Sequence, residues 1–179
     1  MKKRSKKYTE AVSKVEKSRV YSKEEAVKLV KETSISSFDG SVEVAMRLNL
    51  DTKKADQQLR GAIVLPKGTG TNKKVLVIAR GPKGLMPNPK TGTVTLDIAK
   101  AVQEVKAGRV EYRTDSFGNV HGVIGKVSFS EEDLLENLDA FISQIIRIKP
   151  ATVKGEYVKN ISISSTMGPG IKVENNFDK

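Results

Sequence analysis

The sequence predicts an α+β domain in which capped amphipathic helices pack against long strands that have one polar face. Residues 38–50 indicate the first strand, because apolar and polar side chains alternate there with a period of two. Residues 155–174 contain a second strand, in which alternation predicts Tyr157 and Lys159 on one face and Val158 on the other, outer face, which is rich in hydroxyl and amide groups. Ser22 and Ser130 each stand three residues before an acidic side chain and directly before an apolar run, which is typical of a helix N-cap.

Composition favours a single domain with an anionic partner. The chain has 179 residues, enough for one hydrophobic core, and a formal net charge of +11. That charge predicts nucleic acid as the partner and, as a weaker alternative, an anionic membrane surface. The absence of cysteine excludes disulfides and thiolate metal sites. The N-terminal residues lack the apolar core of a signal peptide and no apolar run could span a bilayer, so we expect a cytoplasmic protein.

The strongest one-signed charge lies between residues 57 and 96, which contain no Asp or Glu. The cations of this stretch are Arg60, Lys67, Lys73, Lys74, Arg80, Lys83 and Lys90. An apolar run at 75–79 indicates a buried strand over 73–79, and a Pro- and Gly-dense loop follows at 81–92. Such a field beside a structured loop suits a polyanion. The alternative is a solvated basic surface.

The other elements are set by periodicity, caps and turn residues. The predicted helices are a short basic amphipathic helix within 1–20, a helix from Ser22 to about Thr33, a helix that starts at Thr93 or Thr95 and is ended by Gly108, and the main core helix from Ser130 to about Pro150. The predicted β structure is a strand at 61–65 closed by Pro66 and a region with turns over 109–129, which includes a hairpin turn at 115–119. We expect a βαβ-type unit, which consists of the strand before the 81–92 loop, the helix after that loop and the strand at 109–113. The acidic first turn of the core helix should face away from a polyanion.

None of the sequence motifs fits a catalytic or metal site. Residues 67–74 look like a phosphate-binding loop, but a strand follows them and no Gly precedes Lys73, so a basic hairpin turn is favoured. His121 is the sole histidine and fits packing or a phosphate contact better than catalysis. Asp51 and Asp56 form a loose pair in a polar loop. We therefore expect no catalytic residue, no metal site, no cofactor and no enzymatic activity.

Several specific motifs, in order along nearly the whole chain, carry a family resemblance. They are Phe38-Asp-Gly-Ser-Val-Glu-Val44, Asp56-Gln-Gln-Leu-Arg-Gly61, Gly84-Leu-Met-Pro-Asn-Pro-Lys-Thr-Gly-Thr93, Val105-Lys-Ala-Gly-Arg109 and Ser165-Thr-Met-Gly-Pro169. With them the chain resembles the family of large ribosomal subunit protein one, the stalk protein of bacteria. The resemblance implies a two-layer α/β sandwich of the split βαβ (ferredoxin/RRM-like) type, built from both chain ends. It also implies binding to the stalk region of large-subunit rRNA in the ribosome, contact with tRNA, and repression of translation by binding the mRNA of its own operon.

The chain departs from that family in length. Family members carry a second domain inserted between the strand ending at Ala79 and the segment starting at Gly81. Here Ala79 is joined almost directly to Gly81, so residues 1–179 should form a single RNA-binding domain with the second domain excised at about 80–82. Pro and Gly can close such a junction without a long linker. We expect a monomer when the protein is free.

The family's RNA contacts transfer to two segments of this chain. They fall on Phe38, Ser41 and Glu43 in the first strand and on Thr166, Met167 and Gly168 after the last, with Asp115 as a weaker transfer. Ser41 stands where the family pattern has Thr, and Asn160 where it has Ser, but the hydroxyl at residue 41 is retained. Weaker phosphate contacts are expected from Lys2, Lys3, Arg4, Lys67, Lys83 and Lys90, which would position the RNA without specifying it.

Three rival functions remain open at the level of sequence. A non-specific basic nucleic-acid-binding domain would share the charge and lack the specific contacts. A nuclease or methyltransferase would need a carboxylate cluster or a cofactor loop, and neither occurs in the sequence. A membrane-surface protein would need a long basic helix with Phe or Leu on its other side, whereas the first helix is short and has small aliphatic residues and Tyr8.

Overall fold

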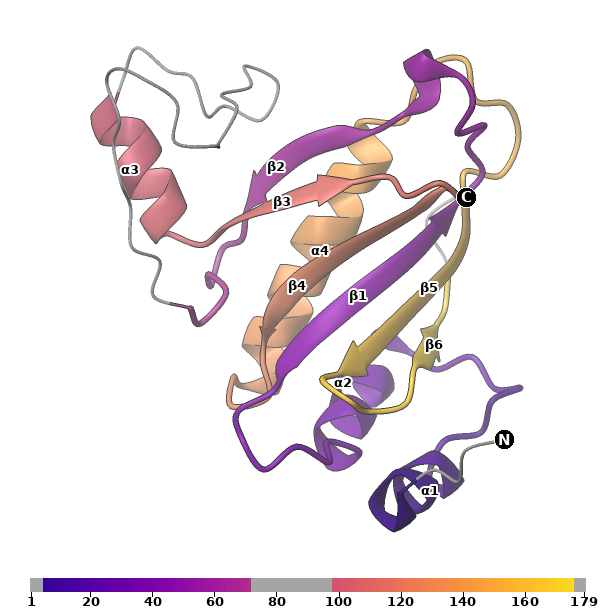
Figure 1. The fold of residues 1–179 in the computed structure, drawn as a ribbon, viewed down its shortest axis with the longest axis vertical. Coiled ribbons are helices and arrows are strands. Elements are labelled where there is room, and N and C mark those ends of the chain that lie inside the picture. Colours follow the sequence, from indigo (N-terminus) through magenta and orange to yellow (C-terminus); the bar gives the residue numbers. More distant parts are fainter. Residues whose placement is uncertain (1–4, 72–97, 176–179) are drawn as a thin grey trace.

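A computed structural model describes residues 5–71 and 98–175 of the chain, which form two antiparallel sheets and the helices around them (Figure 1). The helices are α1 (Lys6–Ser13), α2 (Lys23–Glu32), α3 (Ile98–Lys106) and α4 (Glu131–Arg147), with a short 3-10 helix η1 (Ala55–Gln57). The strands are β1 (Ser41–Leu48), β2 (Arg60–Val64), β3 (Arg109–Arg113), β4 (Asn119–Lys126), β5 (Val158–Ser165) and β6 (Ile171–Val173). The mixture of helices with antiparallel sheets agrees with the predicted α+β class.

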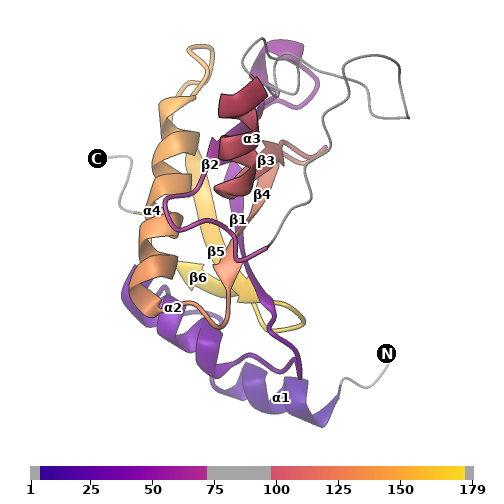
Figure 2. The same ribbon diagram turned by 90° about the vertical axis from the view of Figure 1, so that its left-hand side faces the viewer.

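The main sheet has the strand order β4-β1-β5-β6, with β1 antiparallel to both of its neighbours. The chain leaves β4, forms α4 and returns as β5 on the other side of β1. α2 and α4 contact each other and the same side of this sheet, and Figure 2 shows them edge-on along that side. The opposite side faces the viewer of Figure 1 with no helix over β1, β4 or β5. One sheet face is therefore core and the other is open.

β1 shows why one face became core. Val42, Val44, Met46 and Leu48 are buried, while the residues between them are exposed or half-buried. The predicted alternation is confirmed within the strand. Its start is not at Phe38: residues 37–38 form a bend and residues 39–40 are irregular, and the Ser36 hydroxyl donates to the Phe38 carbonyl at 2.9 Å. Phe38 lies in the loop before the strand.

The predicted helix starts at Ser22 and Ser130 are confirmed. The Ser22 hydroxyl accepts the Glu25 amide at 3.2 Å, and the Ser130 hydroxyl accepts the Asp133 amide at 3.1 Å. α1 is the short basic helix expected within residues 1–20, and Ser5 caps it. α3 is followed by Gly108 at a φ of 103°, a left-handed value that stops a helix at low cost in glycine.

One assignment of strand faces was wrong. The simple alternation predicted Lys159 beside Tyr157 on one face and Val158 on the other, but Tyr157 and Val158 are both buried and Lys159 is exposed. The cause is a β-bulge, because Arg47 pairs with Asn160 while the next residue of β1 pairs with Val158. The extra residue inverts the alternation at that end of β5.

The second sheet is the antiparallel β2–β3 ribbon, at the positions that the sequence predicted. An isolated bridge between Thr114 and Val120 joins β3 to the start of β4. The predicted strand at 73–79, the 81–92 loop and the junction at 80–82 lie outside the described residues, as does the start of the helix at Thr93 or Thr95. The βαβ-type unit built on them is therefore untested.

The core is one connected cluster from Val15 to Val173, so both ends of the chain contribute to it. α4 is its centre: Leu134, Leu138, Phe141, Ile142 and Ile145 are fully buried, as the apolar stripe predicted. Within the described ranges, none of the helices combines the length and apolarity needed to cross a bilayer.

Candidate nucleic-acid interface

Two segments far apart in the chain meet at one end of the open face. The Ser41 amide donates to Thr166 Oγ1 at 2.9 Å across 125 residues of sequence. In return, the Thr166 amide and the Thr166 hydroxyl donate to the Ser41 carbonyl at 2.9 and 3.2 Å. Thr166 therefore binds the start of β1 to the end of β5. We call this end the corner and define it by Phe38, Ser41, Glu43, Thr166, Met167 and Gly168.

The corner exposes apolar side chains on a constrained backbone. Phe38 is 61% exposed and Met167 is 73% exposed, although both are large hydrophobic residues. Met167 has a φ of 65°, the sole positive value at a non-glycine position among the described residues. A side chain in that region costs free energy that the surrounding structure must offset, and such positions concentrate at functional sites. The strain and the exposure point to a ligand here.

The turn leaves little space for a side chain at Gly168. A Cβ atom at this position would lie 2.3 Å from Ser165 Oγ and 3.2 Å from the Ser165 carbonyl oxygen. The Gly168 amide donates to that same carbonyl at 2.8 Å, which closes the turn. The backbone at Gly168 therefore has no side chain of its own between it and a ligand.

Lys126 adds a positive charge to the corner, and the sequence reasoning missed it. Its Nζ donates to Ser41 Oγ at 3.1 Å and to the Asp39 carbonyl at 3.4 Å. The Asp39 carboxylate accepts the amide and the hydroxyl of Ser128, at 3.1 and 2.8 Å. The position of this lysine beside Ser41 follows from the strand register, in which Ser41 pairs with Lys126, and sequence patterns alone do not indicate it.

Glu43 lies on the open face one step along β1 from the corner's hydrogen bonds. It is exposed, and it is flanked by Val123 of β4 and Ser164 of β5. Ser162 and Asn160 continue a half-buried polar row along β5. These groups offer donors and acceptors to the sugar edge of an RNA.

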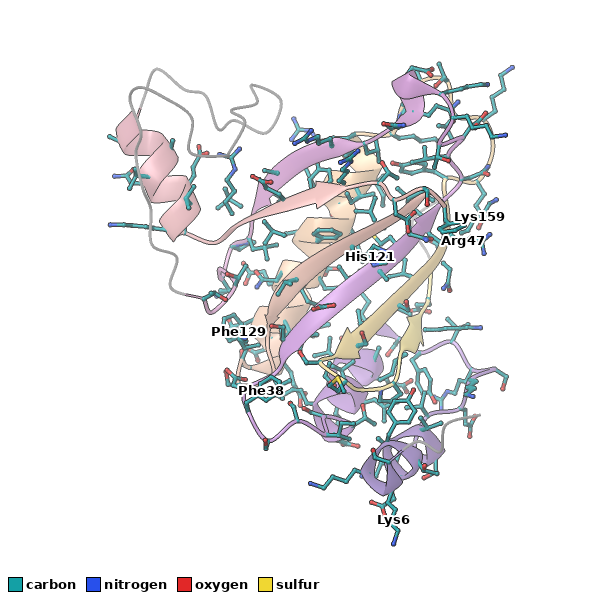
Figure 3. The ribbon with its side chains drawn as sticks, viewed as in Figure 1. Lys6, Phe38, Arg47, His121, Phe129 and Lys159 are labelled. Carbon is teal, nitrogen blue, oxygen red and sulfur yellow. The ribbon has the colours of Figure 1, made fainter. Side chains whose placement is uncertain are left out.

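Asp115 is not part of this cluster. β4 separates its turn from Lys126 by roughly 20–25 Å, given about 3.3 Å per strand residue. Figure 3 shows Phe38 near one end of the sheet and His121, Arg47 and Lys159 toward the other, the end where β4 begins after Asp115. His121 Nε2 lies 3.6 Å from Asp115 Oδ2.

Asp115 instead organises its own turn. Its carboxylate accepts the Phe117 amide, the Asn119 amide and the Asn119 side-chain amide, each at 2.8 Å. Burial alone would raise the pKa of Asp115, but the hydrogen bonds from Asn119 and Phe117 outweigh it and lower the pKa from 3.8 to about 2. The carboxylate is therefore held ionised as a turn acceptor.

Lys67 is already engaged by carboxylates. Its Nζ lies 3.4 Å from Asp133 and 3.4 Å from Glu136 at the start of α4. The hydrogen bonds to Asp133 and Glu136 raise the pKa of Lys67. Lys67 is therefore a weaker candidate for a contact with an RNA phosphate than its charge alone suggests. The other lysines and the arginine predicted to contact phosphate, at residues 2–4, 83 and 90, lie outside the described residues.

The described residues give no other chemistry to the site. Within 5–71 and 98–175, no group of three His, Cys, Asp or Glu side chains could hold a metal ion. The arrangement can stack on, hydrogen-bond and attract an RNA strand, and it contains no arranged nucleophile, base or metal.

Comparisons with known proteins agree with the motifs. The sequence model of the Ribosomal protein L1p/L10e family matches residues 30–83 and 80–169. The chain is 48% identical over 225 aligned positions to a protein of Mycoplasma capricolum named "Large ribosomal subunit protein uL1", covering 97% of this chain and 100% of that protein. Because the family model spans most of the chain and the identity extends over nearly all of it, this chain belongs to the Ribosomal protein L1p/L10e family.

Proposed function

We propose that this chain binds the stalk region of large-subunit rRNA through the corner, and that the same surface binds the mRNA of its own operon and represses its translation. Membership of a ribosomal-protein family makes the chain a non-enzymatic component of the ribosome in the cytoplasm, with a structural role in binding rRNA of the large subunit. The proposal includes four points: the stalk as the rRNA region bound, binding to the operon mRNA, a contact with tRNA, and a monomeric state when the protein is free.

The observation that carries the proposal is the joining of two distant segments around exposed, strained residues. Thr166 and Ser41 fix each other by backbone and side-chain hydrogen bonds. Phe38 lies three residues before Ser41 and Met167 directly follows Thr166, and both side chains are exposed. Preorganised side chains lose little conformational entropy on binding, which favours a specific complex over a loose electrostatic one.

Four of the six corner residues, and Lys126 beside them, have chemical roles that fit RNA. Phe38 can stack on a base or ribose, and Glu43 can accept from an amino group or a 2′-hydroxyl. The Thr166 hydroxyl uses its donor and one acceptor on Ser41, which leaves one acceptor for a 2′-hydroxyl. Gly168 lets backbone approach closely, and Lys126 supplies phosphate attraction.

We also propose that the chain is the family's first domain, with the second domain excised at about residues 80–82. The alignment with the Mycoplasma protein spans 225 positions, which is more than the 179 residues of this chain. The family model matches in two segments that meet at residues 80–83. The placement of β1 between β4 and β5, with α4 connecting them, supports a split βαβ arrangement of the ferredoxin/RRM-like type.

A salt titration of RNA binding tests the proposal. We expect a stalk-type rRNA hairpin to stay bound at salt concentrations that release a scrambled RNA of equal length. Contacts specific to the hairpin do not depend on counterion release, whereas non-specific contacts do. Equal affinities that fall together with salt would leave only a non-specific basic binder, the alternative that the net charge of +11 favours.

A pair of exposed phenylalanines separates the corner from the rest of the surface. Phe38→Ala should weaken hairpin binding by about 1–3 kcal/mol if its ring stacks on the RNA. Phe117→Ala is the matched control, because Phe117 is 81% exposed in the turn after Asp115. A loss with Phe117→Ala and none with Phe38→Ala would move the contact to that turn and contradict the corner.

A further inference from the structure

Two arginines stand directly opposite each other on the β2–β3 ribbon. The antiparallel register pairs Arg60 with Arg113, and both are exposed. Directly opposite residues of an antiparallel pair project from the same face with their Cβ atoms about 5 Å apart. Like charges in that position destabilise the pair of strands, so this pairing needs an explanation.

No carboxylate of the described residues forms an ion pair with either arginine. That holds for the exposed Glu111, which is next on the same face. Arg109, farther along β3, does have such a partner, since its Nη1 lies 3.5 Å from Glu104 Oε2. The ribbon thus neutralises one arginine and leaves the opposed pair open.

The opposed pair faces the open side of the molecule. Tyr112 packs edge-on against Phe141 of α4, with ring centroids 6.3 Å apart, so its neighbour Arg113 projects away from α4. Gly61, opposite Tyr112, leaves room for that ring, because a Cβ there would lie 2.5 Å from the Tyr112 hydroxyl. Figure 1 shows the ribbon beside β4 with α4 passing behind both. The arginines therefore lie on the same side as the open face of the main sheet.

We propose that Arg60 and Arg113 form a phosphate seat for the backbone of the RNA held at the corner, so that the bound RNA runs along β4 from its Lys126 end to the ribbon beside its Asn119 end. This inference rests on the proposed function. A phosphodiester between two guanidinium groups would replace their repulsion with two charge-assisted contacts, for which arginine geometry is well suited. The seat positions RNA and does not discriminate sequence.

A double substitution with a matched control tests the seat. In Arg60→Gln/Arg113→Gln, hairpin affinity at about 0.1 M salt should fall on the order of tenfold, and the slope of log affinity against log salt should flatten by about 0.7–0.9, as for one phosphate that is no longer neutralised. Scrambled RNA should lose a similar factor. Lys28→Gln/Arg147→Gln removes two exposed cations from α2 and α4, on the covered side, and should leave both quantities near wild type. Equal effects of the two double variants would overturn the seat.

A charge reversal distinguishes the seat from a structural role. Arg60→Glu creates an opposite-charge pair with Arg113, so the thermal midpoint should rise while RNA affinity falls. Wild-type affinity in Arg60→Glu, with wild type still preferring the hairpin, would overturn the seat and leave the proposed function intact. If wild type itself fails to prefer the hairpin, the proposed function fails, and a flattened slope in the double variant would still support a phosphate contact.

Discussion

Thr166 shows how one side chain can hold two strands together and still offer a group to the proposed ligand. Its hydroxyl accepts the Ser41 amide and donates to the Ser41 carbonyl, so two of its three hydrogen-bonding capacities are used inside the protein. Its neighbour Met167 is held at a positive φ by that anchored turn. At the residue scale, the Thr166 hydroxyl therefore has one acceptor lone pair left, and this lone pair is the group that RNA would contact in the corner.

Thr166→Val should lower both stability and specific binding. Val keeps the shape but leaves the Ser41 amide without its acceptor, which should reduce the free energy of unfolding by about 1–2 kcal/mol. Affinity for the stalk hairpin should fall by roughly 1–3 kcal/mol, while scrambled RNA barely changes. Thr166→Ser keeps the hydroxyl and is the control. Equal losses on both RNAs, measured by titration, would contradict a site-specific role for Thr166.

Asp115 should make the free energy of unfolding depend on pH. Its folded pKa of about 2 lies below the ordinary 3.8, so the carboxylate stabilises the fold fully above about pH 4 and loses that effect as pH falls through about 2. Asp115→Asn should therefore be less stable than wild type at neutral pH, and the difference should vanish near pH 2. Chemical denaturation across this range measures it, with Asp56→Asn as an exposed control. A difference that does not change with pH would exclude the ionised turn acceptor.

At the element scale, α4 ties the main sheet to the end of the β2–β3 ribbon through one buried polar side chain. Asn137 is completely buried; its Oδ1 accepts the Lys67 amide at 3.0 Å, and its Nδ2 donates to the carbonyls of Gly68 and Ile124 at 3.0 and 2.8 Å. β4 accommodates α4 with Gly122, where a Cβ would lie 2.4 Å from Phe141. These local fits determine how closely the helix approaches the strands.

Asn137→Ala should destabilise the domain without changing its RNA surface. The substitution leaves a buried amide and two carbonyls unpaired, which should cost about 2–4 kcal/mol of unfolding free energy. Gln144→Ala, on the same helix, should cost much less, because Gln144 is only half-buried. Hairpin affinity of the folded Asn137→Ala protein should match wild type. A loss of affinity below the unfolding temperature would show that α4 also shapes the RNA site.

At the scale of the whole molecule, the proposed binding surface combines residues from both sides of the segment at 72–97 in the sequence. β1 and its preceding loop come before that segment, and β4, β5 and the 166–168 turn come after it. The main sheet and the corner therefore need both halves, and the core cluster contains residues from both. This arrangement explains how a domain could tolerate an insertion or an excision at about 80–82 while its site stays intact.

One shared surface predicts that the two RNAs exclude each other. A labelled stalk hairpin bound to the protein should be displaced by the operon mRNA site with a competitive dependence on concentration. Met167→Ala should weaken both complexes in parallel, because Met167 is exposed at the centre of the shared corner. A ternary complex of protein, hairpin and messenger in sedimentation would contradict a single surface.

The sequence by itself determined the α+β class, the caps at Ser22 and Ser130, the buried face of β1 and the apolar stripe of α4, because these depend on periodicity and on neighbours within a few residues. It also contained the motifs at 38–44 and 165–169 that carry the family resemblance. Only the tertiary structure decided the partner of Thr166, the presence of Lys126 beside Ser41, the separation of Asp115 from the corner, and the opposed arginines. Each of these depends on strand register, and the bulge at Lys159 shows that one extra residue changes which side chains share a face. Register is set by packing between segments distant in the chain, so local patterns could not supply it.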